Sequence, residues 1–306
     1  MLDRASSFHD AETARILTED YVPVALDVFY EERREDTGGE FYRKIVKQRE
    51  NLQPGRTTQG FYIATPDGEL INGWNNRNAQ RLKHRLKLAL VGYEAGKTEF
   101  TPATETDPTY ERSLPQGALV VDVRALIVDA AWQGAGSRWD KIRREAMGRD
   151  HLWITDAERQ ELIAGQWPPS LTRRMARFHL IDNTRGEAPM WRSRDLREAS
   201  LTFESGVLTG RIRLATSTNP PFHPDAAVDR FYDAAVRGVV TIKDDAIVRL
   251  DVVVRGSFFG EGRWTPGSPK KPFTFAVAFA LADLARAASK VPPQASRNLR
   301  SYLEAR

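Results

Sequence analysis

The chain has 306 residues, of which 41% are hydrophobic and 28% charged, so a packed core is feasible and wholesale disorder is not expected. It contains no cysteine, which excludes disulfides, thiolate catalysis and cysteine metal sites for this polypeptide. Lysine and arginine number 45 against 41 acidic residues, and the resulting formal charge of +4 is small for a chain long enough for about two domains.

The first third of the chain predicts helices that alternate with short strands. Ala11, Ala14 and Leu17 have the three-residue spacing of a helix face, whereas Val24 and Leu26 alternate as in a strand. Proline and glycine within 65–68 predict a tight turn between two short strands. The expected order is a helix over 10–20, a strand over 21–28, a helix that ends at Pro54, a hairpin over 61–72 and a helix over 82–93.

Several short motifs in this stretch occur at the spacing of a known family. They are Ser7–Asp10, Ala14–Leu17, Tyr21–Val24 followed by Asp27, Glu31–Arg33 and Thr65–Gly68. Over about residues 6–95, the chain therefore resembles the spermatogenesis-associated thioredoxin-like domain family. The resemblance implies an N-terminal domain with the thioredoxin fold, starting at the first active-site helix of that fold.

Two departures from the family's pattern decide what the resemblance implies about chemistry. The family carries a CxxC-like segment, preceded by a central strand, just upstream of the position of Ser7–Asp10, where this chain begins. The family also places a cis-proline before the hairpin, where this chain has Arg56–Gly60 with Gln59 near the proline position. The resemblance therefore implies a thioredoxin-like domain without redox residues. In the alternative, the chain is an incomplete version of a redox protein whose catalytic segment lies upstream.

The absence of the central strand would leave unpaired backbone groups between the strand over 21–28 and the hairpin. Residues 118–128 are rich in β-branched side chains, which favour strands. We expect part of this segment, or a partner chain in a homo-oligomer, to complete the sheet. In the alternative, the segment belongs to the second domain.

The remainder of the chain predicts a linker and a second domain. Prolines, threonines and charges over 96–116 predict a linker between a domain over 1–95 and an α+β domain over 117–306. Residues 132–196 predict mainly helices, one of which Thr155–Glu158 opens as a capping box. From about residue 198 the hydrophobic period changes to two, with a hairpin turn at Asp244-Asp245. A strand over 273–281 and an alanine-rich helix over 281–289 complete an α+β fold whose antiparallel sheet packs on one side.

The densest polar cluster runs from His179 to Glu187, at a predicted junction between a helix and a loop, and Trp191 follows it. Loops held by rigid elements often carry functional sites. The candidate catalytic residues are His179 as a general base and Asp182 or Glu187 as the carboxylate that orients it. The ligand-binding candidates are Asn183, Arg185 as an anion-binding group, and Trp191. In the structural alternative, Asp182 and Asn183 cap a turn and Arg185 pairs with Glu187.

Other patterns indicate no metal, nucleic-acid or membrane function. Carboxylates over 27–36 are of the type that binds calcium, but their spacing does not fit a calcium loop and the interleaved arginines would repel the ion. The basic runs 77–87 and 173–177 are interpreted as solvated helix faces. No stretch approaches the roughly 18–20 apolar residues of a membrane span, and Met1–Asp10 lacks a secretory signal. We expect no cofactor and no metal, in a cytoplasmic chain as given or a mature form whose export signal has been removed.

The leading hypothesis is a non-redox, thioredoxin-like protein that binds a small ligand or a protein partner, with the second domain supplying the specific surface. The alternative is an enzyme, for example a hydrolase, that uses the cluster from His179 to Glu187 near the domain junction. That alternative requires His179 or Asp182 to lie in a cleft with a perturbed pKa. As given, the chain is not a cysteine-dependent oxidoreductase.

Overall fold

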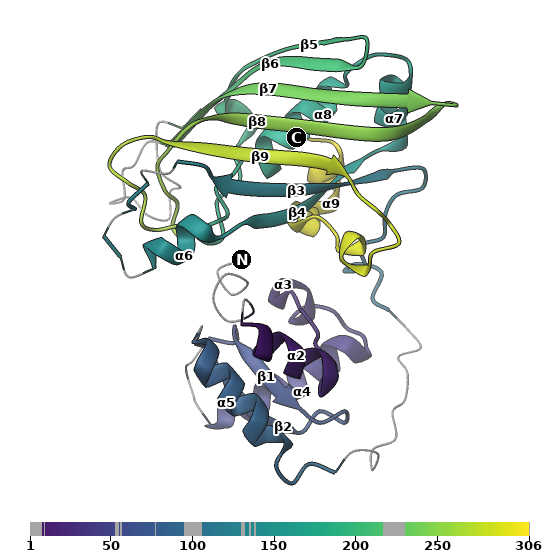
Figure 1. Cartoon of the computed structure of the whole chain (residues 1–306). Coiled ribbons are helices and arrows are strands. Elements are labelled where there is room, and N and C mark those ends of the chain that lie inside the picture. Colours follow the sequence, from purple (N-terminus) through teal and green to yellow (C-terminus); the bar gives the residue numbers. More distant parts are fainter. Residues whose placement is uncertain are drawn as a thin grey trace. The chain divides into compact units, whose positions relative to one another are not determined.

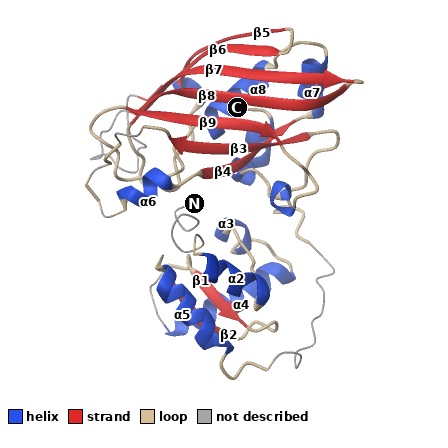
Figure 2. Cartoon of the chain, viewed as in Figure 1, coloured by secondary structure: helices blue, strands red, loops and turns tan. Residues whose placement is uncertain are grey.

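The computed structural model describes residues 8, 10–52, 55, 57–76, 78–94, 106–129, 132–134, 136–137, 139–216 and 230–305 (Figures 1 and 2). These residues form a mixed α+β protein with two compact units, which divide between Glu111 and Arg112. Some residues that the sequence singled out, His9, Arg56 and positions 96–105 of the expected linker, lie outside the described residues. Among the described residues, no helix is long and apolar enough to cross a membrane.

The first unit is a two-stranded antiparallel hairpin packed with helices. In chain order it contains α2 (Ala11–Glu19), α3 (Val28–Glu31), α4 (Thr37–Leu52), β1 (Phe61–Ala64), β2 (Leu70–Trp74) and α5 (Ala79–Leu90). Side chains cap α2 and α5 among these helices, because Asp10 accepts a hydrogen bond from Thr13 N at 2.8 Å and Asn78 accepts one from Arg81 N at 3.0 Å, and α3 also has a side-chain cap. The buried apolar core is small and consists of Ile16, Ile63, Trp74, Leu82, Leu86 and Ala89.

The expected hairpin over 61–72 is confirmed, but the strand expected over 21–28 is wrong. Residues 21–27 form no helix or strand and pair with no strand in the described part of the chain, and Asp27 instead caps α3 through Phe29 N. The side chains of Val22, Val24 and Leu26 are 90%, 69% and 50% exposed. Alternating apolar residues favour a strand only where a neighbouring strand can receive its hydrogen bonds.

The segment over 106–111, expected to be part of the linker, belongs to the first unit. Asp107 N donates a hydrogen bond to Asp36 Oδ2 at 2.7 Å, and Asp107 Oδ2 accepts one from Glu35 N at 3.0 Å. These bonds attach the segment to the connection between α3 and α4.

The second unit is built on a seven-stranded antiparallel sheet with the order β4-β3-β9-β8-β7-β6-β5. Its strands are β3 (Leu119–Ile127), β4 (Gly148–Ile154), β5 (Leu196–Glu204), β6 (Val207–Thr216), β7 (Arg230–Lys243), β8 (Ala246–Phe259) and β9 (Phe273–Leu281). Its helices are α6 (Asp140–Glu145), α7 (Asp156–Ile163), α8 (Pro169–Arg174), the π-helix η1 (Met175–His179), the short turns η2 (Ser193–Asp195), η3 (Ala287–Lys290) and η4 (Gln294–Asn298), and α9 (Leu299–Leu303).

One face of this sheet is buried and the other carries charges. Alternate residues of the central strands, such as Val252, Val254 and Val277, are buried together with Leu162 and Leu171 from α7 and α8, which lie on that face (Figure 1). On the opposite face, where β6 pairs with β7, Arg211 lies opposite Ala235 and Arg213 lies opposite Asp233. The expected sheet packed on one side is therefore confirmed.

Several expectations for this unit were met and others were wrong. Asp244 and Asp245 form the β7–β8 turn, and Thr155 with Glu158 forms the capping box of α7. The region 132–196, expected to be mainly helical, contains the strand β4, and the helix expected over 281–289 is replaced by the end of β9 and by η3.

The proposal that 118–128 completes the sheet of the first unit is also wrong. In the described residues, β3 pairs only with β4 and β9, both of the second unit. The β-branched pattern of this segment identified a strand correctly, but such a pattern does not specify which strand lies beside it.

Candidate functional site

His179 lies at the end of η1, and its side chain is fully buried. Its Nδ1 atom lies 3.1 Å from Asp150 Oδ2, at ion-pair distance, and its Nε2 atom lies 3.2 Å from the hydroxyl of Tyr302. The same hydroxyl accepts a hydrogen bond from Trp153 N at 3.1 Å. A carboxylate, an imidazole and a phenol therefore lie next to one another and connect β4, η1 and α9, although Nδ1 of His179 is not aligned for a hydrogen bond to Asp150.

These three groups have the order found in proton relays, but the series ends in a group that is not poised to react. Burial raises the pKa of the Tyr302 hydroxyl, which therefore stays protonated at neutral pH. The backbone carbonyl of Tyr302 accepts a bond from Arg174 Nε at 2.9 Å, and Arg174 pairs with Glu158, again in the interior. The network connects structural elements and leaves no reactive group at the surface.

Asp182 belongs to a different buried network. Its Oδ2 accepts from Arg185 Nε at 2.6 Å, and its Oδ1 accepts from the hydroxyl of Thr184 at 2.6 Å. Arg185 also donates to the backbone oxygens of Thr265 at 3.0 Å and Gly260 at 2.8 Å. Because each guanidinium nitrogen of Arg185 already has a partner, the role of anion-binding group has no support here, and the ion pair fixes the loop over 260–265.

The other candidate residues also lie apart from His179. Trp191 is buried and donates from Nε1 to Leu180 O at 2.7 Å. Arg230 stacks on the Trp191 ring at 3.8 Å, and burial lowers the pKa of this guanidinium to about 10. Asn183 is buried, with its Oδ1 directed toward the backbone of Gly148.

Glu187 is half-exposed and faces a third set of partners. It accepts hydrogen bonds from Arg297 Nη1 at 2.9 Å and Gln294 Nε2 at 3.3 Å, so the expected pair of Arg185 with Glu187 is wrong. The structure therefore does not bring His179, Asp182 and Glu187 together. The carboxylate beside His179 is Asp150, which the sequence analysis missed because β4 lies in a region expected to be helical.

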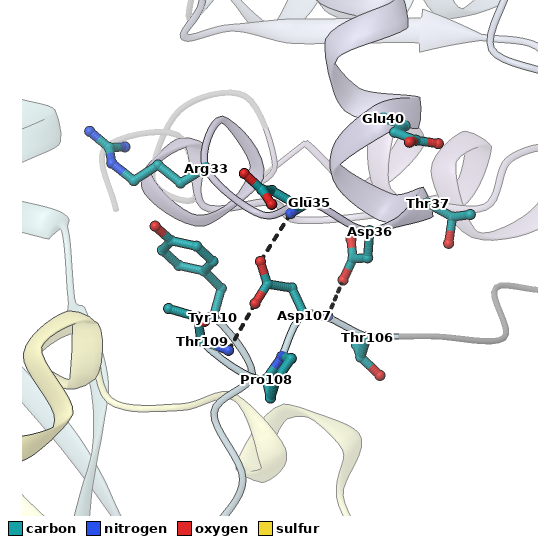
Figure 3. A pocket seen from close by; sticks show the side chains of 10 residues that line it. All are labelled: Arg33, Glu35, Asp36, Thr37, Glu40, Thr106, Asp107, Pro108, Thr109 and Tyr110. Atoms are coloured by element: carbon teal, nitrogen blue, oxygen red, sulfur yellow. Dashed lines mark hydrogen bonds between the residues drawn. The ribbon is translucent and has the colours of Figure 1, made fainter.

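The acidic run over 27–36 borders a hollow of about 630 Å³ in the first unit (Figure 3). Its lining residues are Arg33, Glu35, Asp36, Thr37, Glu40, Thr106, Asp107, Pro108, Thr109 and Tyr110. Figure 3 shows Asp107 and Asp36 directed at backbone nitrogens of the facing segment.

Two carboxylates of this hollow, those of Asp36 and Asp107, already have partners. Asp36 accepts from Arg34 Nε at 2.7 Å and from Gly39 N at 3.1 Å, and the Arg34 guanidinium holds the pKa of Asp36 well below its usual range. Among the described residues, no group of three histidine or acidic side chains is arranged to hold a metal ion. The bonds of Asp36 and Asp107 therefore connect two segments of the first unit at this hollow.

The class that these features define is an α+β protein with a seven-stranded antiparallel sheet, whose candidate catalytic side chains lie in separate networks. No model of a known protein family matches this chain, and no curated protein or solved structure matches it. The function proposed next therefore rests on the chain's own residues.

Proposed function

We propose that this chain is a non-redox, thioredoxin-like protein that binds a protein partner, and that Val22–Leu26 pairs with an extended segment of that partner. The order of elements in the first unit supports the thioredoxin-like assignment, since α2, the unpaired segment over 21–27, α3, α4, the β1–β2 hairpin and α5 follow one another. The absence of cysteine from all 306 residues supports a non-redox role. The single observation that carries the partner-binding proposal is the exposed, unpaired state of Val22–Leu26.

This segment has the chemistry of a sheet edge. All five residues are apolar and exposed, and no hydrogen bond within the described part of the chain uses their backbone groups. An extended apolar segment with free N–H and C=O groups is a template for pairing with another strand. Strand addition uses these main-chain groups for affinity and alternate side chains for specificity.

Pro23 determines which edge of the segment pairs. In an extended chain, successive residues direct their backbone N–H groups to opposite sides, so Val22, Val24 and Leu26 share one edge. The other edge contains Pro23, which has no N–H to donate. The complete set of donors therefore lies on the edge of Val22, Val24 and Leu26, and we assign the partner strand to that edge.

The enzyme alternative has less support. A general base and the group it activates need to lie within hydrogen-bond reach of one another and of a substrate. His179 and Asp182 are each buried and each bonded within a separate structural network. Only 2% of the surface of His179 and 1% of that of Asp182 are exposed.

The proposal is tested by site-specific cross-linking in the native source of the protein. A photo-reactive amino acid replaces Val24, and the control carries it at Val248, which is also exposed but belongs to the paired strand β8. The expected result is a cross-link from position 24, and not from 248, to an extended apolar segment of one defined protein. A cross-link only to a second copy of this chain, or equal products from both positions, would overturn the assignment of a separate partner.

Two proline variants test the edge. Val24→Pro removes a donor from the pairing edge and is expected to abolish the cross-link from a probe at Leu26. Ala25→Pro removes a donor from the opposite edge and is expected to leave that cross-link unchanged. Measurable disulfide reductase or peroxidase turnover by the purified chain would contradict the non-redox part of the proposal.

A further inference from the structure

Arg49 is a buried cation without an acidic partner in the first unit. It lies on the inner face of α4 and is only 5% exposed. Its guanidinium lies 5.1 Å from the centre of the Tyr62 ring, and Nη1 donates to the Tyr62 hydroxyl at 2.8 Å and to Gln59 O at 3.4 Å. None of the acidic side chains that the structure describes lies within ion-pair distance of Arg49. A buried charge in this state is costly until a counter-charge reaches it.

Two buried donors in this cluster have no partner. They are Nε of Arg49 and the hydroxyl of Tyr42, and the two residues lie on the same face of α4, about two turns apart. Burial raises the pKa of Tyr42 to about 12, so this hydroxyl keeps its proton at neutral pH. A buried donor without an acceptor is less stable than the same donor in contact with water.

The hydroxyl of Thr58 interacts with that of Tyr42, and the other acceptors near these two donors are already occupied. The Tyr62 hydroxyl donates to Thr58 O and accepts from Arg49. Glu32 accepts from the Thr58 hydroxyl at 2.9 Å, and Glu31 lies 3.4 Å from Arg34. What the cluster lacks is therefore an acceptor, and beside a guanidinium the matching acceptor is negatively charged.

We propose that Arg49 and Tyr42 form a binding site for a small oxyanion, a carboxylate or a phosphate group. The Nε–Nη2 edge of Arg49 makes no hydrogen bond within the described residues, and this edge has the planar geometry that binds two oxygens of one anion. The hydroxyl of Tyr42 supplies a further donor.

Two features of the surroundings fit such a site. Gly73 on β2 faces Arg49, and a Cβ atom there would lie 3.0 Å from Arg49 Cδ, so glycine leaves room for the arginine. The loop around Thr57–Gln59 borders the cluster and is largely exposed, which gives a small ion a route from solvent. The oxyanion site is independent of the Val22–Leu26 edge and of the partner proposed for it.

The site is tested by NMR titration of the full ¹⁵N-labelled chain with inorganic phosphate and with acetate, against chloride at equal ionic strength. The expected result is a saturable shift of the amides of Thr57, Thr58 and Tyr62 with phosphate or acetate and not with chloride. A response to phosphate alone assigns phosphate ligands to the site, and a response to acetate alone assigns carboxylates.

Three variants locate the site. Arg49→Lys keeps the charge but removes the planar edge, and we expect affinity to fall about tenfold or more, the effect of one charge-assisted hydrogen bond. Tyr42→Phe removes one unpaired hydroxyl without enlarging the side chain and is expected to weaken binding severalfold. The control is Arg85→Lys, since Arg85 also lies over an aromatic ring, Trp74 at 4.8 Å, but donates to Asn72 at 2.6 Å.

Either of two results would overturn the site. One is the absence of a saturable shift with both anions in the folded wild-type chain, which would mean that water alone satisfies Arg49. The other is an anion affinity that is the same in the wild type and in Arg49→Lys, Tyr42→Phe and Arg85→Lys, which would place the anion elsewhere.

Discussion

The hydroxyl of Tyr302 lies 3.2 Å from Nε2 of His179, and no part of the Tyr302 side chain reaches solvent. Through this contact and the hydrogen bond that it accepts from Trp153 N, the hydroxyl of Tyr302 joins α9 to η1 and to β4. Asp150 lies on the other side of the imidazole. The cluster that looked catalytic in the sequence thus connects three elements of the second unit.

The hydroxyl of Tyr302 is expected to contribute to stability rather than to activity. Tyr302→Phe leaves Trp153 N and one nitrogen of His179 without a partner, so we expect the free energy of unfolding to fall by about 1–3 kcal/mol. Denaturant unfolding measures this loss. Tyr93→Phe is the matched control at an exposed position, and an equal effect of the two substitutions would contradict the structural role.

Removing one partner of the Glu158–Arg174 ion pair is expected to lower the free energy of unfolding much more than removing both. Both side chains are almost fully buried. Glu158→Gln leaves a buried guanidinium without its counter-charge and should cost about 3–5 kcal/mol, whereas Glu158→Leu combined with Arg174→Met should cost less. Asp251→Asn breaks the exposed pair with Arg249 and should cost at most about 1 kcal/mol. Thermal and denaturant unfolding of the four proteins compare these costs.

The stabilising contribution of Asp36 is expected to disappear in acid. Arg34 lowers the pKa of Asp36 in the folded state below its value in the unfolded chain. The contribution is therefore fully present above the unfolded pKa, near 3.9, and is lost as the pH falls toward the folded pKa. Asp36→Asn should lower the melting temperature at pH 7, and the difference from the wild type should shrink below about pH 4. Glu40→Gln, on the same hollow, is the control.

The β7–β8 turn is expected to accept a stabilising substitution. Asp244 and Asp245 both have positive φ, 50° and 55°, which is the backbone of a two-residue hairpin turn that favours Asn-Gly. Replacing the pair by Asn-Gly should raise the free energy of unfolding by about 1 kcal/mol, because glycine adopts positive φ without the steric cost of a side chain. Asp245→Val, which places a β-branched side chain at positive φ, should lower the free energy of unfolding. If both changes shifted this free energy in the same direction, the turn geometry would be contradicted.

Local patterns predicted the elements whose cause is local. The capping box at Thr155 and Glu158, the turn over 65–68 and the aspartate pair of the β7–β8 turn each arise from residues close in sequence. The alternation of Leu250, Val252 and Val254 likewise identified a strand with one buried face. These features require no knowledge of distant partners.

The failures concern partners that are distant in sequence. The segment over 21–28 has strand composition without an adjacent strand, and β3 pairs with β9, which follows it only after five other strands. Asp150 meets His179 through the packing of β4 against η1, and no spacing in the sequence encodes that approach. The polar residues from His179 to Arg185 were read as a loop site because composition does not reveal burial.

The position of β9 in the sheet has a consequence for how the protein is made. This strand is the last to be synthesised, yet it lies between β3 and β8. Until it leaves the ribosome, the hairpin of β3 with β4 and the meander from β5 to β8 each present an unpaired edge. Between the synthesis of β8 and that of β9, the nascent chain therefore carries two fragments with open edges, and a ribosome that stalls before Phe273 would release a product prone to aggregate.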